Sequence, residues 1–275
     1  MERFSKSRCT RFDVMKKFVF IAGMPRSGST LLCNLLNQNP RLRATGTSAI
    51  CDLMLGVNAA WGLSPEAKAT ATTQDKLNTL RGLLEGYHAG IEESVVFSKS
   101  RGWVAAAELL QQVLGEPPVI LVTYRDIPSI LSSCEKLFRR ELRNPASTAR
   151  FGANMETIEG RLAHWTGGDQ LVGGNYNRIR DCAMRGNRGL MHFISFDELC
   201  SSPGAVMKGI YEKIGEETFA HDFKTVEQTI VEDDSAHGLP GLHTIRSTVA
   251  PVKKDYREVL GEAWRAYAGF NYDFI

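Results

Sequence analysis

A glycine-rich loop, Gly23–Thr30, is the part of the sequence best suited to chemistry. It reads Gly-Met-Pro-Arg-Ser-Gly-Ser-Thr, follows an apolar run and precedes residues with helical spacing. Glycines let the backbone turn tightly, so that consecutive N–H groups and the following helix N-terminus point at one anion. A tight turn without a ligand is the simpler alternative. The two glycines, followed by Ser29 and Thr30, favour a phosphate-binding loop instead.

This loop departs at one position from the pattern of nucleoside triphosphatases, G-x-x-x-x-G-K-[ST]. Ser29 stands where the lysine that contacts the terminal phosphates is expected. The cation lies inside the loop, at Arg26, whose guanidinium can bind a tetrahedral oxyanion with two hydrogen bonds. The strand expected at 119–123 continues into Tyr124 and Arg125 and offers no aspartate for magnesium. These differences favour a group that is transferred without a metal.

Strand-like and helix-like segments alternate along the chain, which predicts a parallel sheet covered by helices on both faces. The expected buried strands are Lys17–Ala22, Ser94–Ser98, Val119–Thr123 and Gly189–Ser195. The expected helices are Thr30–Asn37, Ser64 to about Ala89, Trp103–Leu114, Ile127–Leu142, Met155–Trp165, Pro203–Ile214 and Glu262–Tyr267. The glycine pairs at 167–168 and 173–174 indicate a turn, and 232–251 a long loop.

Length and composition fit one globular α/β domain at 17–275, with helical elaborations near 50–90 and 135–187. The chain has 275 residues, 43% hydrophobic and 23% charged, and a net charge of +2 that gives no support to nucleic-acid binding. Its six cysteines form no C-x-x-C pair, which indicates reduced thiols. The apolar run at 18–22 is too short to span a membrane, and we expect a cytoplasmic protein. Residues 1–16 are expected to form a solvated basic leader, and a homo-oligomer is left open.

The segment Pro25–Leu32 closely resembles the 5′-phosphosulfate loop of sulfotransferases. Its arginine is similar to that of the tyrosylprotein sulfotransferases and many bacterial and viral relatives. Arg125 and Ser133 resemble the family pair that holds the 3′-phosphate of 3′-phosphoadenosine 5′-phosphosulfate (PAPS). The resemblance implies a three-layer P-loop NTPase-like fold with a central parallel sheet. It also implies a sulfotransferase that moves a sulfuryl group from PAPS to a hydroxyl or amine by in-line displacement.

Three further segments extend the resemblance over about residues 17–260. Lys99, in Phe97–Ser100, resembles the strand-end lysine that contacts the bridging oxygen of the sulfuryl group. Ile194–Pro203 is similar to the late strand and helix of the family, and Ile245–Val249 to the loop that folds over the cofactor. The resemblance implies a metal-free PAPS site made by Pro25, Arg26, Ser27, Gly28, Ser29, Thr30, Arg125, Ser133, Arg246, Ser247 and Lys253.

The resemblance does not identify the base that takes the acceptor's proton. Arg101 stands where cytosolic sulfotransferases have a histidine, and Thr45–Ala49 has no carboxylate where Golgi-type enzymes have a glutamate. Asp52 is the nearest carboxylate and joins Arg26 and Lys99 as a catalytic candidate, although an ordinary helix-start role is favoured for it. The alternatives are His88, His164, His192, His237 and His243.

Two other functions remain open at this point. A divergent P-loop kinase would need the loop lysine and a magnesium aspartate, and neither is present. A non-catalytic nucleotide-binding module would explain why no base is found, but it would not explain Lys99 at the end of the expected strand. The acceptor implied for the sulfotransferase is a small molecule, a glycan or a peptide, and the sequence does not choose among them.

Overall fold

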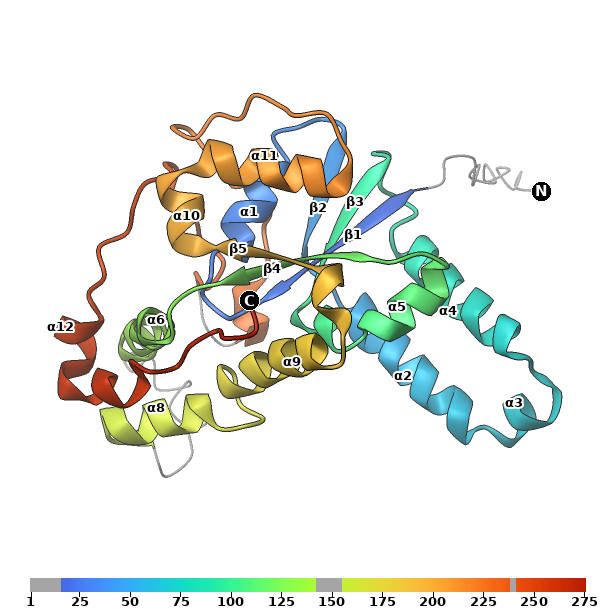
Figure 1. Ribbon diagram of the computed structural model, residues 1–275, viewed down its shortest axis with the longest axis horizontal. Helices are drawn as coiled ribbons and strands as arrows, with labels where there is room; N and C mark the ends of the chain where they lie inside the picture. Colours follow the sequence, from blue (N-terminus) through green and yellow to red (C-terminus); the bar gives the residue numbers. More distant parts are fainter. Residues whose placement is uncertain (1–15, 142–154, 238–240) are drawn as a thin grey trace, which may run out of the picture.

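A computed structural model describes residues 16–141, 155–237 and 241–275 (Figure 1). Within these residues the strands form one five-stranded sheet, in the order β2-β3-β1-β4-β5, and every neighbouring pair is parallel. The strands are β1 (Lys17–Gly23), β2 (Leu42–Thr47), β3 (Val95–Lys99), β4 (Val119–Tyr124) and β5 (Met191–Ser195). Helices cover both faces of this sheet, which confirms the predicted three-layer α/β architecture.

The helices divide into two layers that pack on opposite faces of the sheet (Figure 1). One layer holds α1 (Ser29–Leu36), α10 (Phe196–Ser201) and α11 (Pro203–Ile214). The other holds α2 (Ile50–Leu63), α4 (Thr73–Tyr87), α5 (Ala107–Leu114), α6 (Ile127–Glu141), α8 (Ile158–Thr166), α9 (Gly173–Met184) and α12 (Tyr256–Leu260). The remaining short elements are α3 (Pro65–Thr70), η1 (Arg101–Val104), η3 (Asn187–Leu190), η4 (Asp234–His237) and η5 (Gly261–Tyr267).

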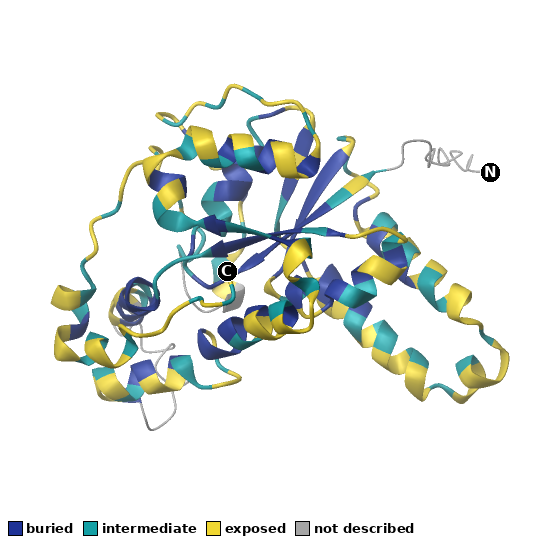
Figure 2. Ribbon diagram, viewed as in Figure 1, coloured by how far each residue is buried: buried dark blue, intermediate teal, exposed yellow. Residues whose placement is uncertain are grey.

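Strand β1 lies at the centre of the sheet because both of its faces are apolar. Phe20 and Ala22 enter the core under the α2–α9 layer, whereas Val19 and Ile21 enter the core under α1 and α11. Residues of a strand alternate between faces, so a strand covered on both sides needs a continuous apolar run. Figure 2 shows the central strands as the most deeply buried part of the chain. This burial holds the loop after β1 at a fixed point of the sheet edge.

Strand β2 escaped the sequence analysis, and helix α2 was expected only as an unbounded part of the helical stretch near 50–90. The sequence of β2 is Leu-Arg-Ala-Thr-Gly-Thr, and as an edge strand it buries only Leu42 and Ala44. It therefore lacks the apolar run that marks the interior strands. Helix α2 is apolar in composition, but its hydrophobic residues are spread around the helix and only Ile50, Cys51 and Met54 are buried.

Helix boundaries also differ from expectation in two places. The single helix expected from Ser64 to about Ala89 is two helices, because Thr72 and Asp75 form a capping box that starts α4. The glycine pair at 173–174 begins α9 and does not form a turn. A Cβ on Gly173 would lie 2.1 Å from the carbonyl oxygen of Thr166, so glycine lets the new helix start against the end of α8.

A long segment of mostly irregular backbone, described at residues 221–237 and 241–249, passes over α1; we call it the closing segment. Asn34 on α1, fully buried, accepts hydrogen bonds from the backbone N–H groups of Thr229 (2.6 Å) and Ile230 (3.1 Å). Val226 N donates to Ser247 O at 2.6 Å, which folds the segment back on itself. One side-chain amide of α1 thus fixes the segment beside the glycine-rich loop.

Candidate active site

A cavity of about 540 Å³ opens at the edge of the sheet where the parallel strands end. Its walls come from the segments that follow β1, β3 and β4, from α6 and α10, and from the closing segment. Ligands of open α/β sheets bind at this carboxyl edge because the loops after several strands converge there. Residues of the glycine-rich loop line this cavity, together with Lys99, Arg125 and His243.

The glycine-rich loop is shaped by close backbone contacts. Gly23 has a φ of 137°, and a Cβ there would lie 2.2 Å from the carbonyl oxygen of Thr123 on β4. Gly28, with φ 87°, caps the N-terminus of α1, whose first turn carries no acidic side chain. Arg26 has φ 58°, a left-handed conformation that costs a non-glycine residue energy and is concentrated at functional sites. The first-turn N–H groups of α1 are therefore available to an anion.

The side chain of Arg26 reaches across the cavity to α6 and the closing segment. Its Nε donates to Ser133 Oγ at 3.0 Å, and its Nη1 donates to the carbonyl oxygen of Leu242. Burial lowers the pKa of this guanidinium, so its charge lies where an anion would gain most from it. Burial also raises the pKa of the nearby Cys134 thiol to about 12, which keeps that sulfur protonated.

Lys99, at the end of β3, forms an ion pair with Glu232 of the closing segment. Lys99 Nζ lies 2.7 Å from Glu232 Oε1, and the two side chains are only 7% and 11% exposed. Burial alone would raise the pKa of Glu232, but the hydrogen bond and charge of Lys99, with Thr47 and His243, outweigh it and lower that pKa. Glu232 is therefore a charged carboxylate beside the lysine that the sequence identified for catalysis.

The carboxylate of Glu232 lies against the end of β2, in the stretch where the sequence has no acidic residue. A Cβ on Gly46 would come within 3.1 Å of Glu232 Cγ, and Thr47 contributes a hydrogen bond to the carboxylate. A residue 186 positions further along the chain, counting from Gly46 to Glu232, thus supplies a negative charge at this place. Only the fold could reveal it, because no local pattern links the two segments.

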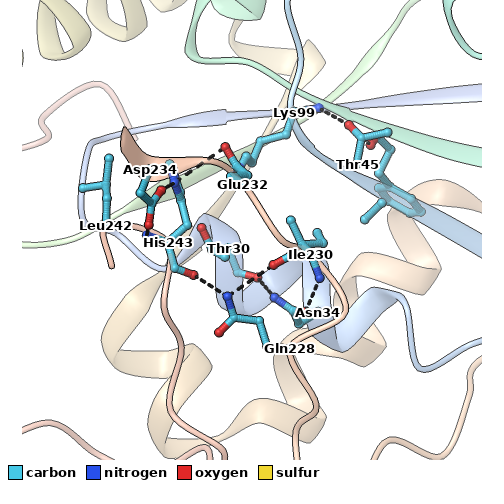
Figure 3. Close-up of polar contacts among 12 residues, drawn as sticks. Thr30, Asn34, Thr45, Lys99, Gln228, Ile230, Glu232, Asp234, Leu242 and His243 are labelled. Atoms are coloured by element: carbon cyan, nitrogen blue, oxygen red, sulfur yellow. Dashed lines mark hydrogen bonds and ion pairs between the residues drawn. The ribbon is translucent and has the colours of Figure 1, made fainter. Parts of the chain in front are cut away.

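His243 lies on the other side of the same carboxylate (Figure 3). Its Nδ1 is 3.6 Å from Glu232 Oε2 and 2.5 Å from Asp234 Oδ1. Asp234 also accepts a hydrogen bond from the backbone N–H of His243, at 3.0 Å. The closing segment therefore brings one imidazole to the wall of the cavity, with two carboxylates behind it, where the sequence predicted only a long loop.

Arg125, directly after β4, is held by an aromatic ring. Its guanidinium carbon lies 4.5 Å above the ring centroid of Phe196, at the start of α10. Its Nε is buried and has no hydrogen-bond partner among the described residues. Burial lowers the pKa of this guanidinium. A buried donor without a partner costs free energy, so Arg125 is a candidate to bind an anionic ligand.

The cavity runs along one face of α6 and changes character on the way. Ser129, Ser133 and Leu137, which line it, are four residues apart and so lie in a row on that helix. Arg125 lies near the first of them, whereas Trp165 and Leu171 join the wall at the other end. One end is thus cationic and polar, and the other is apolar and fit to receive an organic body.

Most of the residues predicted for the site line this cavity. They are Pro25, Arg26, Gly28, Ser29, Thr30, Lys99, Arg125, Ser133, Arg246 and Lys253. Ser27, Ser247 and Asp52 are not among the residues that line it. Ser27 is buried and its Oγ hydrogen-bonds Thr123 Oγ1 at 2.7 Å, so its side chain supports the loop from behind. Ser247 is exposed on the closing segment, and Asp52 is exposed in the first turn of α2.

The positions of the candidate histidines show which of them can reach the cavity. His88 is 1% exposed and packs beside Ser98, away from the cavity. His164 is exposed on α8, and His192 is half-buried on β5. Of the candidate histidines whose side chains the structure describes, His243 is the one that lines the cavity. The side chain of the fifth candidate, His237, lies outside the described part of the chain.

The described residues contain neither a cluster of side chains that could hold a metal ion nor a membrane-spanning helix. No group of three or more histidine, cysteine, aspartate or glutamate side chains there is arranged to hold a metal ion. In the same parts of the chain, no helix is both long enough and apolar enough to cross a bilayer.

Comparison with known proteins identifies the family. A sequence profile described as "Sulfotransferase family" matches residues 19–220, while none of the curated proteins matches the chain. The sulfotransferase domain of the olefin synthase from Synechococcus PCC 7002 has the same fold, with 17% identity, a TM-score of 0.54, and coverage of 94% of this chain and 96% of that one. A sulfotransferase domain from the curacin biosynthetic pathway is 14% identical with a TM-score of 0.51, over 95% and 94% of the two chains. The chain belongs to the sulfotransferase family.

Proposed function

We propose that this protein transfers a sulfuryl group from PAPS to a hydroxyl or amine of an organic acceptor. The observation that supports this most directly is the meeting of Arg26, Lys99 and Arg125 in one cavity around the N-terminus of α1. PAPS carries a 3′-phosphate and a 5′-phosphosulfate, and the cavity offers cations and N–H donors for both. The positive φ of Arg26 and the close packing of Gly23 keep the loop in a shape that suits an anion.

The two anionic groups of the donor would be bound by different segments. The loop Gly23–Thr30 would bind the 5′-phosphosulfate with backbone N–H groups and Arg26. Arg125 would bind the 3′-phosphate, since its buried Nε has no hydrogen-bond partner in the described chain. Ser129 and Ser133 line the same wall and can donate hydroxyl hydrogen bonds. Arg246 and Lys253 line the cavity from exposed positions and would add positive charge at its rim.

The transfer step follows from this placement. The acceptor oxygen or nitrogen attacks sulfur and forms the new bond, while the bond from sulfur to the 5′-phosphate oxygen breaks and adenosine 3′,5′-bisphosphate leaves. Charge grows on that leaving oxygen, and Lys99 and Arg26 are the cations that would stabilise it. Positioning and preorganised charge carry most of such a reaction. The apolar end of the cavity, with Leu137, Trp165 and Leu171, would hold the body of the acceptor.

We propose that the transfer needs no metal, because three cations from the protein balance the charge of the donor. Transfer should therefore persist in excess EDTA. The assay compares the rate after chelation with the rate after magnesium is restored. Loss of the rate on chelation and its recovery with magnesium would instead favour a divergent kinase.

Two measurements on the whole protein test the function. Calorimetry should show binding of adenosine 3′,5′-bisphosphate that is stronger than binding of ATP with magnesium. A radiolabelled-sulfate assay over small alcohols, amines, glycans and tyrosine peptides should then detect transfer and identify the acceptor. Binding without transfer to any acceptor would support a nucleotide-binding module instead. We propose a cytoplasmic site of action, which fractionation of the source cells would check.

A further inference from the structure

We infer that His243 is the general base of the reaction and that Asp234 positions it; this inference rests on the proposed sulfotransferase function. The sequence named His243 as one of five alternative bases and did not point to Asp234, and the proposed transfer step leaves the acceptor's proton unassigned. His243 lines the cavity that also contains Arg26 and Lys99. A base must lie within reach of the proton that it removes, so the position in the cavity is the first requirement.

The imidazole of His243 is held in a defined orientation by Asp234. Asp234 Oδ1 lies 2.5 Å from the ring Nδ1, and Asp234 Oδ2 accepts the backbone N–H of the same histidine at 3.0 Å. The side chains of His243 and Asp234 are 15% and 12% exposed, so the contact is protected from water. When Nδ1 donates to a carboxylate, the neutral ring carries its lone pair on Nε2. Asp234 thus selects the tautomer that can accept a proton at Nε2.

Two contacts fix the backbone around His243 to the rest of the site. Arg26 donates to the carbonyl oxygen of Leu242, and Gln228 Nε2 donates to the carbonyl oxygen of His243 at 3.3 Å. Asn34 in turn anchors Thr229 and Ile230 beside Gln228. The base is therefore tied to the arginine of the glycine-rich loop. Through Gln228 and the contacts of Asn34 it is also tied to α1, the helix that starts at that loop (Figure 3).

Glu232 places the base next to the cation that would stabilise the leaving group. One of its carboxylate oxygens binds Lys99 Nζ at 2.7 Å, and the other lies 3.6 Å from His243 Nδ1. The proposed base and the cation for the leaving group thus lie against opposite oxygens of one buried carboxylate. Glu232 itself is a poorer candidate for the base, because Lys99 lowers its pKa and so makes it a weaker proton acceptor, and because it does not line the cavity.

The charges around His243 suit a group that becomes positive during the reaction. Asp234 and Glu232 face the ring from the closing segment and would stabilise the imidazolium. Lys99 from β3, Arg26 from the loop and Arg140 from α6 are the cations near these carboxylates. In the step itself, the acceptor's O–H or N–H proton passes to Nε2 while the acceptor bonds to sulfur. The bisphosphate leaves with the electron pair of the broken bond.

The experiment compares two acceptor probes, phenol, which is neutral at pH 7, and pentafluorophenol, which is ionised. His243→Gln should lower the rate of sulfuryl transfer to phenol by about a hundredfold or more, since a general base contributes on that order. With pentafluorophenol the loss should be less than about tenfold, because no proton has to be removed. If the enzyme sulfates neither phenol, water serves as the probe through donor hydrolysis, which His243→Gln should slow and His164→Gln should not.

Asp234→Asn should lower the rate with phenol in the same selective way, because an amide in this place can favour the wrong tautomer. The double variant Asp234→Asn/His243→Gln should transfer the sulfuryl group to phenol no more slowly than His243→Gln alone, since the two residues act as one unit. The control variants are His164→Gln, on an exposed face of α8, and Asp233→Asn, the neighbouring aspartate; both should retain the wild-type rate.

The possible outcomes distinguish a failure of the assignment of His243 from a failure of the proposed sulfotransferase function. Calorimetry with adenosine 3′,5′-bisphosphate should give the same affinity for wild-type and His243→Gln protein. If wild-type protein does not bind the bisphosphate, the proposed function falls, and the assignment of the base falls with it. If binding and transfer are normal but His243→Gln is equally slow with both phenols, or as fast as wild-type protein, His243 is not the base.

Discussion

The two ends of the polar cavity hold their cations in opposite ways. At the end expected to bind the phosphosulfate, Lys99 is paired with Glu232, and Arg26 donates to Ser133 and Leu242. At the end expected to bind the 3′-phosphate, Arg125 stacks on Phe196 and its buried Nε has no partner in the described chain. The first end is organised before a ligand arrives, whereas the second gains a hydrogen bond only from the ligand. The first should therefore control rate, and the second affinity.

The largest effect is expected for Arg26→Ala. Removing one preorganised donor from a developing oxyanion costs on the order of 10²–10³ in rate, and a charged donor should be at the upper end. The measurement is kcat for sulfuryl transfer, with Arg43→Ala, an exposed arginine on β2, as the matched control. If Arg26→Ala kept the wild-type kcat and lost only affinity for the bisphosphate, the two ends of the cavity would not differ in their effects on rate and affinity.

Lys99→Ala should lower kcat by about tenfold or more and change the affinity for the bisphosphate less, as expected for a contact made in the transition state. The substitution also leaves the buried Glu232 without its cation, which destabilises the protein for a separate reason. Lys99→Ala/Glu232→Ala removes both charges and distinguishes the two effects. If the double variant regained the wild-type kcat, Lys99 would be a structural partner of Glu232.

Arg125→Gln should act on affinity and selectivity. A hydrogen bond to a charged group contributes about 1.5–3 kcal/mol, so the preference for adenosine 3′,5′-bisphosphate over adenosine 5′-monophosphate should fall by about tenfold or more. Calorimetry with both nucleotides measures it, and kcat at saturating donor should change little. Equal affinity of the wild-type protein for the two nucleotides would contradict the assignment of Arg125 to the 3′-phosphate.

The smallest effect concerns stability in acid. Burial raises the pKa of Glu232, but Lys99 and the other partners lower it further, to below its ordinary 4.5. A lowered pKa contributes stability that is present above pH 4.5 and is lost as the pH falls through the pKa of the folded state. Glu232→Gln should therefore lose less free energy of unfolding than wild-type protein between pH 5 and pH 3, roughly the range of carboxyl titration. Urea titrations of both proteins at each pH compare the losses.

The sequence could predict the parts of the site that depend on neighbouring residues. The loop Gly23–Thr30 lies between an apolar strand and a helix, and each of these has its own local pattern. Lys99 and Arg125 were found because each follows directly on a predicted strand. The carboxyl ends of parallel strands converge, so such residues meet without further information.

The parts that escaped prediction depend on distant contacts. The ion pair between Lys99 and Glu232 joins side chains 133 residues apart, and Glu232 stands in a tract without periodicity. Asp52 was selected for its proximity in sequence, although the first turn of α2 holds it outside the residues that line the cavity. His243 could be named among five histidines, but its place in the wall of the cavity became visible only in the fold.

The buried amide of Asn34 has a consequence for the order in which the protein folds. It accepts the backbone N–H groups of Thr229 and Ile230 and donates to the carbonyl oxygen of Thr30 within its own helix. These bonds can form only after α1 has packed on the sheet, so we expect the closing segment to dock late and to detach first. A partly unfolded form would then keep the glycine-rich loop but lack the closing segment, whose residues, His243 among them, complete the other wall of the cavity. Local opening of this kind has a lower free energy than global unfolding.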